Sequence, residues 1–152
     1  MGSISVRAAV PSDRAFVLDL AERFGPTRAA WRGYAEVVDG TRAVLAAALD
    51  ARREGEAVLI AVRGADEAVG CVYLITQRDF FTGEPHGHIS EIATSADGGG
   101  AGRSLMDAAE SWSRERGFRY LSLNVNDANE KARRFYERRA YEPEYRHLVK
   151  LL

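Results

Sequence analysis

A cluster of four glycines is the part of the sequence whose composition points most directly to chemistry. Gly98, Gly99, Gly100 and Gly102 lie between an expected strand and an expected helix. Because glycine has no side chain, the backbone N–H groups of such a turn can approach a ligand, and the helix N-terminus adds positive potential. The cluster therefore predicts a cradle for an anion such as a phosphate, and a flexible connector is the alternative interpretation.

The spacing of these glycines excludes two common phosphate-binding motifs. A dinucleotide fingerprint requires Gly-x-Gly-x-x-Gly, and starting from Gly98 or Gly100 the last position falls on Arg103 or Leu105. A nucleotide P-loop requires Gly-Lys-Ser/Thr, which does not follow the cluster. Any anion must therefore be held by a different arrangement.

A second group of residues lies further along the chain. Asn129, Ala132 and Tyr136 are spaced i, i+3 and i+7, which places them along one face of an expected helix. One face of a helix can line one ligand. A tyrosine in this position is otherwise a core or interface residue.

Taken together, these features resemble the GNAT superfamily of N-acetyltransferases. In that family the turn reads Arg/Gln-x-x-Gly-x-Gly/Ala, and the segment from Asp97 to Gly102 matches its glycines. The later motif is similar to Asn-x-x-Ala-x-x-Phe-Tyr, from Asn129 to Tyr136. Two features depart from the family: Asp97 stands where Arg or Gln is usual, and the entry to the turn is about two residues shorter. We expect weaker cofactor binding from these departures, partly offset by Arg103.

The resemblance implies a fold, a co-substrate and a set of binding residues. The fold is mixed α/β, with a mostly antiparallel twisted sheet, one parallel strand pair around the CoA site and about four flanking helices. Residues 1–152 form one acetyltransferase domain that uses acetyl-CoA and no metal. The cofactor-binding residues implied are Ile92, Ala93, Thr94, Gly98, Gly99, Gly100, Ala101, Gly102, Arg103, Ser104, Asn129, Ala132 and Tyr136.

Within this set, the resemblance gives particular roles to strand backbone and to Tyr136. The backbone of residues 92–94 would pair with the pantetheine arm, and one of its amides would polarise the thioester carbonyl. Tyr136 would face the departing sulfur. A phenol titrates near 10 and a thiol near 8.5, so hydrogen bonding to the thiolate is a safer role than complete proton transfer.

Glu91 is the first candidate for a catalytic base. It lies in an otherwise apolar strand, where burying an unpaired charge is unfavourable, so its presence there favours a functional role. An outward-facing residue paired with a cation is the alternative interpretation. A carboxylate there could take the proton of an amine directly or through water. Glu84 and Asp79 are held in reserve.

The acceptor is expected to be a primary amine of a small molecule or a peptide that attacks acetyl-CoA directly in a ternary complex. Trp31, Tyr34 and Glu84 are the candidate substrate-binding residues. Polyamine, aminoglycoside-like, amino-acid and peptide N-terminal acceptors remain open. The alternative functions are a catalytically idle acyl-CoA-binding sensor and a structural protein in which the glycine turn is a linker.

Composition limits the partners and the location. The chain has 152 residues, a formal net charge of −1 and a pI near 6.3, so no basic field for nucleic acid or an anionic membrane is expected. A single cysteine, Cys71, and the lack of a long apolar window favour a cytoplasmic protein. The pair His86 and His88 is weak evidence for a metal. Acetyl-CoA and an amine are the expected partners, and the chain could also form a homodimer.

The elements that must position these residues can be read from periodicity and turn signals. Strands are expected over residues 4–9, 57–63, 68–77, 88–94, 120–125 and 145–152. Helices are expected after an N-cap at Ser12, after an N-cap at Thr41, over about 102–116 and over 129–139. The strand, helix, strand order over residues 88–125 implies one parallel pair in an otherwise antiparallel sheet.

Overall fold

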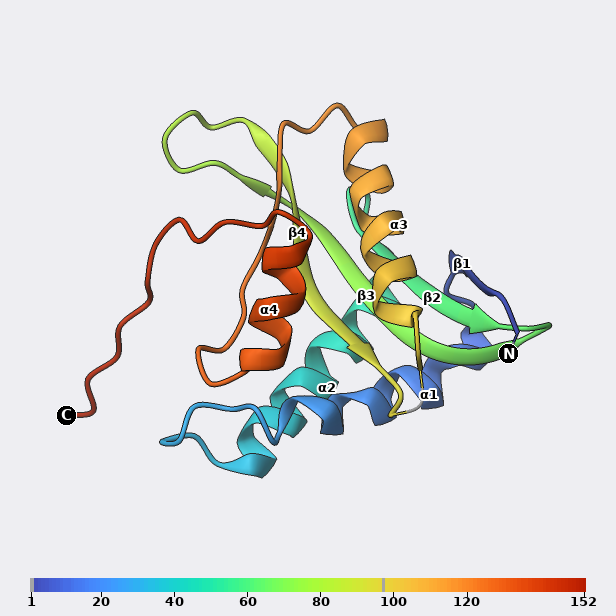
Figure 1. The fold of residues 1–152 in the computed structure, drawn as a ribbon, viewed down its shortest axis with the longest axis horizontal. Coiled ribbons are helices and arrows are strands. Elements are labelled where there is room, and N and C mark those ends of the chain that lie inside the picture. The colour runs from blue at the N-terminus through green and yellow to red at the C-terminus, as the bar shows by residue number, and fades with distance from the viewer. Residues whose placement is uncertain (1, 97) are drawn as a thin grey trace.

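A five-stranded sheet forms the centre of the protein in the computed structural model, which describes residues 2–96 and 98–152. The strand order follows the chain, β1-β2-β3-β4-β5. All neighbours are antiparallel except β4 and β5, which are parallel. The predicted mixed α/β class with one parallel pair is therefore confirmed (Figure 1). The strands are β1 (Ile4–Ala8), β2 (Ala57–Arg63), β3 (Glu67–Arg78), β4 (Pro85–Thr94) and β5 (Leu121–Leu123).

Helices cover both faces of this sheet. They are α1 (Arg14–Asp19), α2 (Tyr34–Ala51), α3 (Ala101–Glu115) and α4 (Glu130–Arg138), with 3-10 helices η1 (Pro11–Asp13) and η2 (Leu20–Phe24). On one face, Leu105 and Met106 of α3 are fully buried against β3 and β4, and α4 packs beside them. On the other face, Leu20 of η2 and Leu45 of α2 are buried against β2 and β3. The sheet thus separates two apolar cores (Figure 1).

The first two helices begin at residues other than those predicted. Ser12 is not the N-cap. Instead, the carboxylate of Asp13 accepts the backbone N–H of Val10 at 2.8 Å. Thr41 lies inside α2, which begins at Tyr34, because Glu36 bonds back to the backbone N–H of Gly33 at 3.3 Å and starts the helix there.

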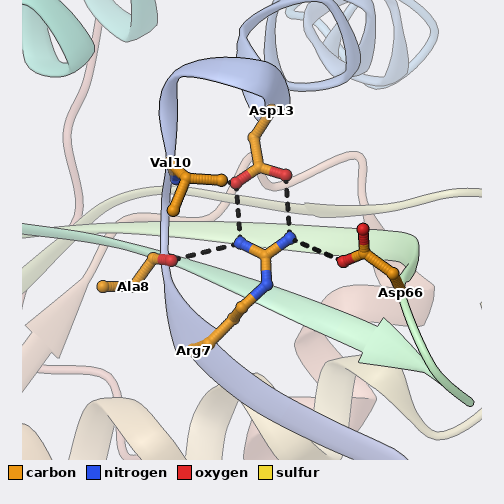
Figure 2. Close-up of polar contacts among 5 residues, drawn as sticks. All are labelled: Arg7, Ala8, Val10, Asp13 and Asp66. Carbon is orange, nitrogen blue, oxygen red and sulfur yellow. Dashed lines mark hydrogen bonds and ion pairs between the residues drawn. The ribbon is translucent and has the colours of Figure 1, made fainter.

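Asp13 also fixes the start of the chain to the sheet. Its two carboxylate oxygens accept two hydrogen bonds from the Arg7 guanidinium of β1, at 2.7 and 3.0 Å (Figure 2). Arg7 makes a further contact of 3.3 Å with Asp66 in the β2–β3 turn. A bidentate pair with one buried partner holds η1, β1 and this turn in one arrangement.

The predicted C-terminal strand over residues 145–152 is wrong for this structure. Residues 142–152, all of them described, have no regular secondary structure and are exposed. In Figure 1 this segment leaves the top of α4 and runs away from the body. A strand requires a neighbouring edge to pair with, and residues 145–152 meet none among the described residues. β5 is likewise shorter than the predicted 120–125.

Candidate active site

The glycine turn is built from backbone hydrogen bonds that lead directly into α3. Gly98 N donates to Ser95 O at 3.0 Å, and Ala101 N donates to Gly98 O at 2.8 Å. Ser95 is in turn anchored to the neighbouring strand, because its N–H donates to Val69 O at 2.9 Å. The amides of Gly102 and Arg103 follow in the first turn of α3, where N–H groups have no carbonyl of a preceding helical turn to bond. These amides are the part of the turn best suited to an anion.

The glycines of the cluster differ in why they are needed. A Cβ on Gly98 would lie 2.9 Å from Val69 O, which is too close, and Gly100 has a φ of +84°. Gly99 has open space around it, so nothing in the fold demands a glycine there. A Cβ on Gly102 would lie 3.6 Å from the Phe135 ring of α4, an ordinary contact. The turn therefore needs Gly98 and Gly100 for its shape, whereas Gly99 faces free space.

Asp97, the residue that departs from the family pattern, lies outside the described residues. Of the residues that follow the turn, Ala101 is buried, Arg103 is exposed and Ser104 is half-buried. Arg103 is thus free to reach a ligand at the end of α3.

A gap in strand pairing opens next to this turn. Three residue pairs join β5 to β4, and the last of them is Ile89 with Leu123. β5 ends at that pair, whereas β4 continues to Thr94. On the side that β5 occupies earlier, the edge of β4 from Ser90 to Thr94 has no strand partner among the described residues. This edge includes Ile92, Ala93 and Thr94, whose predicted pairing with an extended ligand stays a prediction.

A β-bulge in β4 decides which way Glu91 points. In the β3–β4 ladder Tyr73 pairs with Glu91 and Leu74 pairs with Ile89, so Ser90 is an extra residue without a partner. Strict alternation would place Glu91 on the same face as Ile89, which packs in the α3 core. The bulge moves Glu91 to the opposite face.

On that opposite face, Glu91 borders a small cavity beneath η2 and α2. The other residues that line it are almost all apolar: Leu20, Phe24, Leu45, Cys71, Ile92 and Ala93. Among the described residues, the one hydrogen bond to the carboxylate comes from Ser90 Oγ at 3.5 Å, which is a weak contact. No ion pair joins Glu91 to a cation in the part of the chain that the structure describes. The alternative interpretation, an outward residue paired with a cation, is not what the structure has.

These surroundings set the protonation of Glu91. Burial disfavours the charged form and raises the pKa of Glu91 to about 7, and the Ser90 hydroxyl lowers it to a smaller extent. A carboxylate with a pKa near neutrality can both accept and release a proton at physiological pH. This is the property required of a general base.

Helix α4 lies beside the glycine turn through its contact with α3. Asn129 is the N-cap of α4, and its Oδ1 accepts the backbone N–H of Ala132 at 3.2 Å. This bond uses the carbonyl side of Asn129, so its NH₂ group still has donors for a ligand. Asn129, Ala132 and Tyr136 are half-buried, and Tyr136 packs against the α3 core.

Tyr136 stands between two other aromatic rings. It makes edge contacts with Phe135 and Tyr141, with ring centroids 5.4 and 5.9 Å apart. Among the described residues its hydroxyl has no hydrogen-bond partner. Burial raises the pKa of Tyr136 above its ordinary value. The phenol therefore keeps its proton and can donate a hydrogen bond, while full proton transfer becomes less favourable than for a free tyrosine.

The end of α4 is tied to α3 by a polar cluster. Arg139 donates to Asp107 at 2.6 Å and to Glu110 at 2.8 Å, and the Tyr141 hydroxyl donates to Glu110 at 3.2 Å. The basic residue Arg139 is thus used for docking the helix and is not available to a phosphate.

The three predicted substrate-binding residues are not brought together. Trp31 lies in the turn before α2 and Tyr34 is the first residue of α2; both are exposed, and Arg32 stacks over Trp31 at 4.0 Å. Glu84 is exposed and directly precedes β4, and in Figure 1 the β3–β4 loop lies at the opposite end of β4 from the start of α2. Trp31 and Tyr34 remain neighbours on the side of the sheet that Glu91 faces, and Glu84 is separate from them.

Asp79, a reserve base, has a structural role in the β3–β4 loop. Its carboxylate accepts the backbone N–H groups of Phe81 and Thr82 at 2.9 and 2.8 Å, and the Tyr120 hydroxyl at 2.6 Å. These bonds, led by Tyr120, lower the pKa of Asp79 to about 2. A carboxylate so strongly stabilised as an anion is a poor proton acceptor.

His86 and His88 are both buried but serve separate contacts. The His86 ring stacks on Tyr120 with centroids 4.3 Å apart, and His88 Nδ1 lies 2.8 Å from Ser122 Oγ. No group of three or more His, Cys, Asp or Glu side chains that could hold a metal occurs among the described residues. Desolvation lowers the pKa of both histidines.

Ser90 and Tyr120 are two residues that the sequence analysis missed. Nothing in the local sequence marks Ser90 as a bulge, because the extra residue is defined only by the register with β3.

Cys71 is buried, and desolvation raises the pKa of its thiol to about 12, so it does not supply a nucleophile.

The candidate site therefore consists of an unpaired stretch of the β4 edge, the glycine turn that follows β4, and the Glu91 carboxylate, which has no cation partner among the described residues. The family model for the Acetyltransferase (GNAT) family matches residues 19–141. The chain therefore belongs to the GNAT acetyltransferase family.

Solved structures of similar fold cover nearly the whole chain at low identity. A transcriptional regulator from Bacillus halodurans C-125 is 18% identical with a TM-score of 0.76, covering 99% of this chain and 100% of that one. Ribosomal-protein-alanine N-acetyltransferase from Brucella melitensis biovar Abortus 2308 is 21% identical with a TM-score of 0.69, covering 99% of both. AAC(6′)-Iy, solved with the bisubstrate analog CoA-S-monomethyl-acetylneamine, is 15% identical with a TM-score of 0.73, covering 99% and 98%. These likenesses support the fold.

Two further observations complete the comparison. No curated protein matches the sequence. Within residues 2–96 and 98–152, no helix has the length and apolar character needed to cross a membrane.

Proposed function

We propose that the protein transfers an acetyl group from acetyl-CoA to a primary amine of a small molecule or peptide, with residues 1–152 acting as one domain. The observation that carries this proposal is the position of Glu91. Its carboxylate has no cation partner among the described residues, and it borders the open edge of β4 on the face away from α3. The family membership supports acetyl-CoA as the donor.

The residues present fit an extended, anionic thioester co-substrate. The free amides at the start of α3 suit a pyrophosphate, and the unpaired edge of β4 suits a pantetheine arm. When bound, acetyl-CoA supplies an activated acyl group with a thiol leaving group. Ile92, Ala93 and Thr94 would orient it through backbone hydrogen bonds, and Asn129 would add donors from the N-terminus of α4.

Glu91 takes the proton that the amine must lose. As the amine nitrogen bonds to the carbonyl carbon, the proton passes to a Glu91 oxygen directly or through one water, and the carbon–sulfur bond breaks. A backbone amide of β4 at residues 92–94 stabilises the negative charge on the carbonyl oxygen. Glu91 then returns its proton to solvent.

Tyr136 stabilises the departing sulfur. Its protonated phenol, raised in pKa by burial, donates a hydrogen bond to the thiolate without giving up its proton. The thiolate then takes its proton from solvent. No covalent intermediate on the protein is required, which agrees with the buried position of Cys71.

The partly exposed rings of Trp31 and Tyr34 lie on the side of the sheet that Glu91 faces, and we propose that they contact the acceptor. Aminoglycoside-like amines and peptide N-termini are reasonable acceptors to test first, since one structurally similar protein is named a ribosomal-protein-alanine N-acetyltransferase and another was solved with an acetylneamine bisubstrate analog. Polyamines and free amino acids complete the panel.

The decisive experiment is an amine panel with acetyl-CoA, in which free CoA thiol is detected and the product is identified by mass. Release of thiol with an acetylated amine is the expected result. Thermal stabilisation by acetyl-CoA without thiol release from any amine would favour an acyl-CoA sensor. Absence of both would contradict the proposal. Glu115→Gln, which alters an exposed acid at the end of α3 far from the glycine turn, is a control that keeps activity.

A further inference from the structure

A second cavity lies where the end of α2 meets the sheet. Its volume is about 230 Å³, and its wall includes Tyr73 of β3, which pairs directly with Glu91 in the β3–β4 ladder. Directly opposite residues of two strands point to the same face, so this cavity and Glu91 lie on one side of the sheet. In the part of the chain that the structure describes, the two cavities share no lining residue, and none of the residues assigned to acetyl transfer lines the second one.

One wall of this cavity is apolar. It is formed by Ala48 and Leu49 of α2 and by Val58 of β2. Ala48 is buried, and Leu49 and Val58 are half-buried members of the same apolar core. A wall of this kind offers contact to an aliphatic group of a ligand.

A second part of the cavity carries negative charge. Glu56 accepts a hydrogen bond from the Tyr73 hydroxyl at 2.7 Å through Oε2, and its carboxylate has further lone pairs to offer. Among the described residues, no backbone N–H from beyond α2 caps the last carbonyl groups of this helix. Uncapped carbonyls at a helix C-terminus attract a cation. This part of the cavity therefore favours an ammonium group.

A third part carries positive charge. Arg52 and Arg53 both line the cavity, and Arg52 forms no ion pair in the described chain. Arg53 lies 4.0 Å from Glu56 Oε1, which is a loose contact that a ligand can replace. Arg52 has a φ of +42°, a left-handed position in which helices usually carry glycine. The chain thus keeps a guanidinium beside the cavity in spite of an unfavourable backbone conformation, and guanidinium groups suit a carboxylate.

The loop that carries these charges is fixed before any ligand arrives. Thr76 Oγ1 of β3 donates to Gly55 O at 2.7 Å, and Glu56 N donates to Arg53 O at 3.2 Å. Together with the bond from Tyr73 to Glu56, these contacts hold residues 52–56 on β3. The charged groups are therefore preorganised, as they are in most sites for small molecules.

We propose that this cavity binds a free α-amino acid with an aliphatic side chain, such as leucine. The ligand carboxylate meets Arg52 and Arg53, its ammonium meets Glu56 and the end of α2, and its side chain lies on the apolar wall. An organic anion would bring its charge close to Glu56, and a simple amine would leave both guanidinium groups unused. A zwitterion satisfies both kinds of charge. The site is separate from the acceptor site of the proposed function and does not depend on it.

The first test is calorimetric titration of the native chain with leucine, without acetyl-CoA. Isocaproate, which lacks the ammonium, and isoamylamine, which lacks the carboxylate, are titrated in the same way. Leucine should bind saturably at one site, and each analogue should bind about tenfold more weakly or worse. No binding of leucine up to its solubility would overturn the proposal. Equal affinity for isocaproate would overturn it as well, in favour of a site for organic anions.

The second test uses variants that keep the fold. Arg52→Gly removes the guanidinium and suits the left-handed conformation, and Glu56→Gln keeps an acceptor for the Tyr73 hydroxyl. Each should weaken leucine binding by about tenfold or more. Glu54→Gln is the matched control, because it alters an exposed acid of the same loop that does not line the cavity, and it should bind as the native chain does. Thermal melting without leucine checks that every variant folds. Native affinity in Arg52→Gly and Glu56→Gln would contradict the proposal.

A third variant separates this site from the acceptor site. Glu91→Gln should bind leucine with native affinity, because Glu91 does not line the second cavity. Loss of leucine binding in Glu91→Gln, with binding retained in Arg52→Gly, would place leucine at the acceptor site and overturn the proposal. Since these titrations contain no acetyl-CoA, failure of acetyl transfer in the amine panel leaves their result unaffected.

Discussion

Tyr73 lies directly opposite Glu91 in the β3–β4 ladder, and the next pair is Leu74 with Ile89. This one-residue shift at Ser90 turns the Glu91 carboxylate from the α3 core towards the cavity beneath η2 and α2. Glu91 is thereby desolvated without being paired to a cation among the described residues. The bulge thus connects the register of two strands to the proton acceptor of the proposed reaction.

The rate of acetyl transfer should follow the ionisation of Glu91. Because only the carboxylate accepts a proton and its pKa is about 7, kcat/KM should rise with pH through about 7 and then level off, provided that the amine's own titration is subtracted. Glu91→Gln should lower kcat by about a hundredfold or more and abolish this rise. A pH–rate profile for both proteins checks the expectation. An unchanged profile in the variant would remove Glu91 from the mechanism.

The same residue should make folding stability depend on pH. The pKa of Glu91 is raised in the folded state, so the folded protein binds more protons than the unfolded chain between about pH 4.5 and 7. The contribution of Glu91 to the free energy of unfolding therefore falls as pH rises through this window. Glu91→Gln should be more stable than the native protein at about pH 8, by on the order of 2 kcal/mol, and equal at about pH 4. Urea unfolding at both pH values measures the difference, and a larger gap at the acidic pH would contradict the assigned shift.

Tyr136→Phe should lower turnover more than the affinity for acetyl-CoA. The lost interaction is made to the thiolate that develops during the reaction, so the loss of kcat should be on the order of tenfold. Tyr141→Phe is the matched control, because its hydroxyl bonds Glu110 and serves the docking of α4. That control should reduce the melting temperature and leave kcat unchanged. Equal turnover in Tyr136→Phe and the native protein would argue against the role.

Alanine substitutions at Gly98, Gly99 and Gly100 should have different effects on stability. Gly99→Ala should be tolerated, since its side chain would meet open space. Gly100→Ala should cost about 1–2 kcal/mol because of its φ of +84°, and Gly98→Ala should be comparably damaging through the clash with Val69 O. Thermal melting with and without CoA measures both fold and binding. Equal behaviour of all three variants would show that the turn is a flexible connector.

The pair between Arg7 and Asp13 should contribute to stability. Asp13→Asn leaves the Arg7 guanidinium without its charged partner and should cost about 2 kcal/mol. Arg7 lowers the pKa of Asp13, so the native advantage is present near neutral pH and is lost as the pH falls through the acid range. Asp66→Asn, which alters an exposed partner of the same guanidinium, should change stability by less than about 0.5 kcal/mol. Chemical unfolding of both variants at neutral and acidic pH decides the matter.

The sequence by itself determined the class of fold, the family and the position of the glycine turn between β4 and α3. These features depend on local patterns: the β-rich apolar runs of residues 57–63 and 68–77, the amphipathic spacing of α3, and the glycine cluster between a strand and a helix. Helix starts were less well predicted, because the N-terminal contacts of Asp13 and Glu36 compete with other polar residues nearby.

The tertiary structure decided what depends on neighbours in space. The bulge at Ser90 exists only in register with β3, and it alone places Glu91 on the face beneath α2. The separation of Glu84 from Trp31 follows from the elements that carry them, because Glu84 lies in the β3–β4 loop and Trp31 lies in the connection between η2 and α2. Residues 145–152 have the pattern of a strand and yet form none, because a strand is completed by the edge that it pairs with, and its own sequence does not supply that edge.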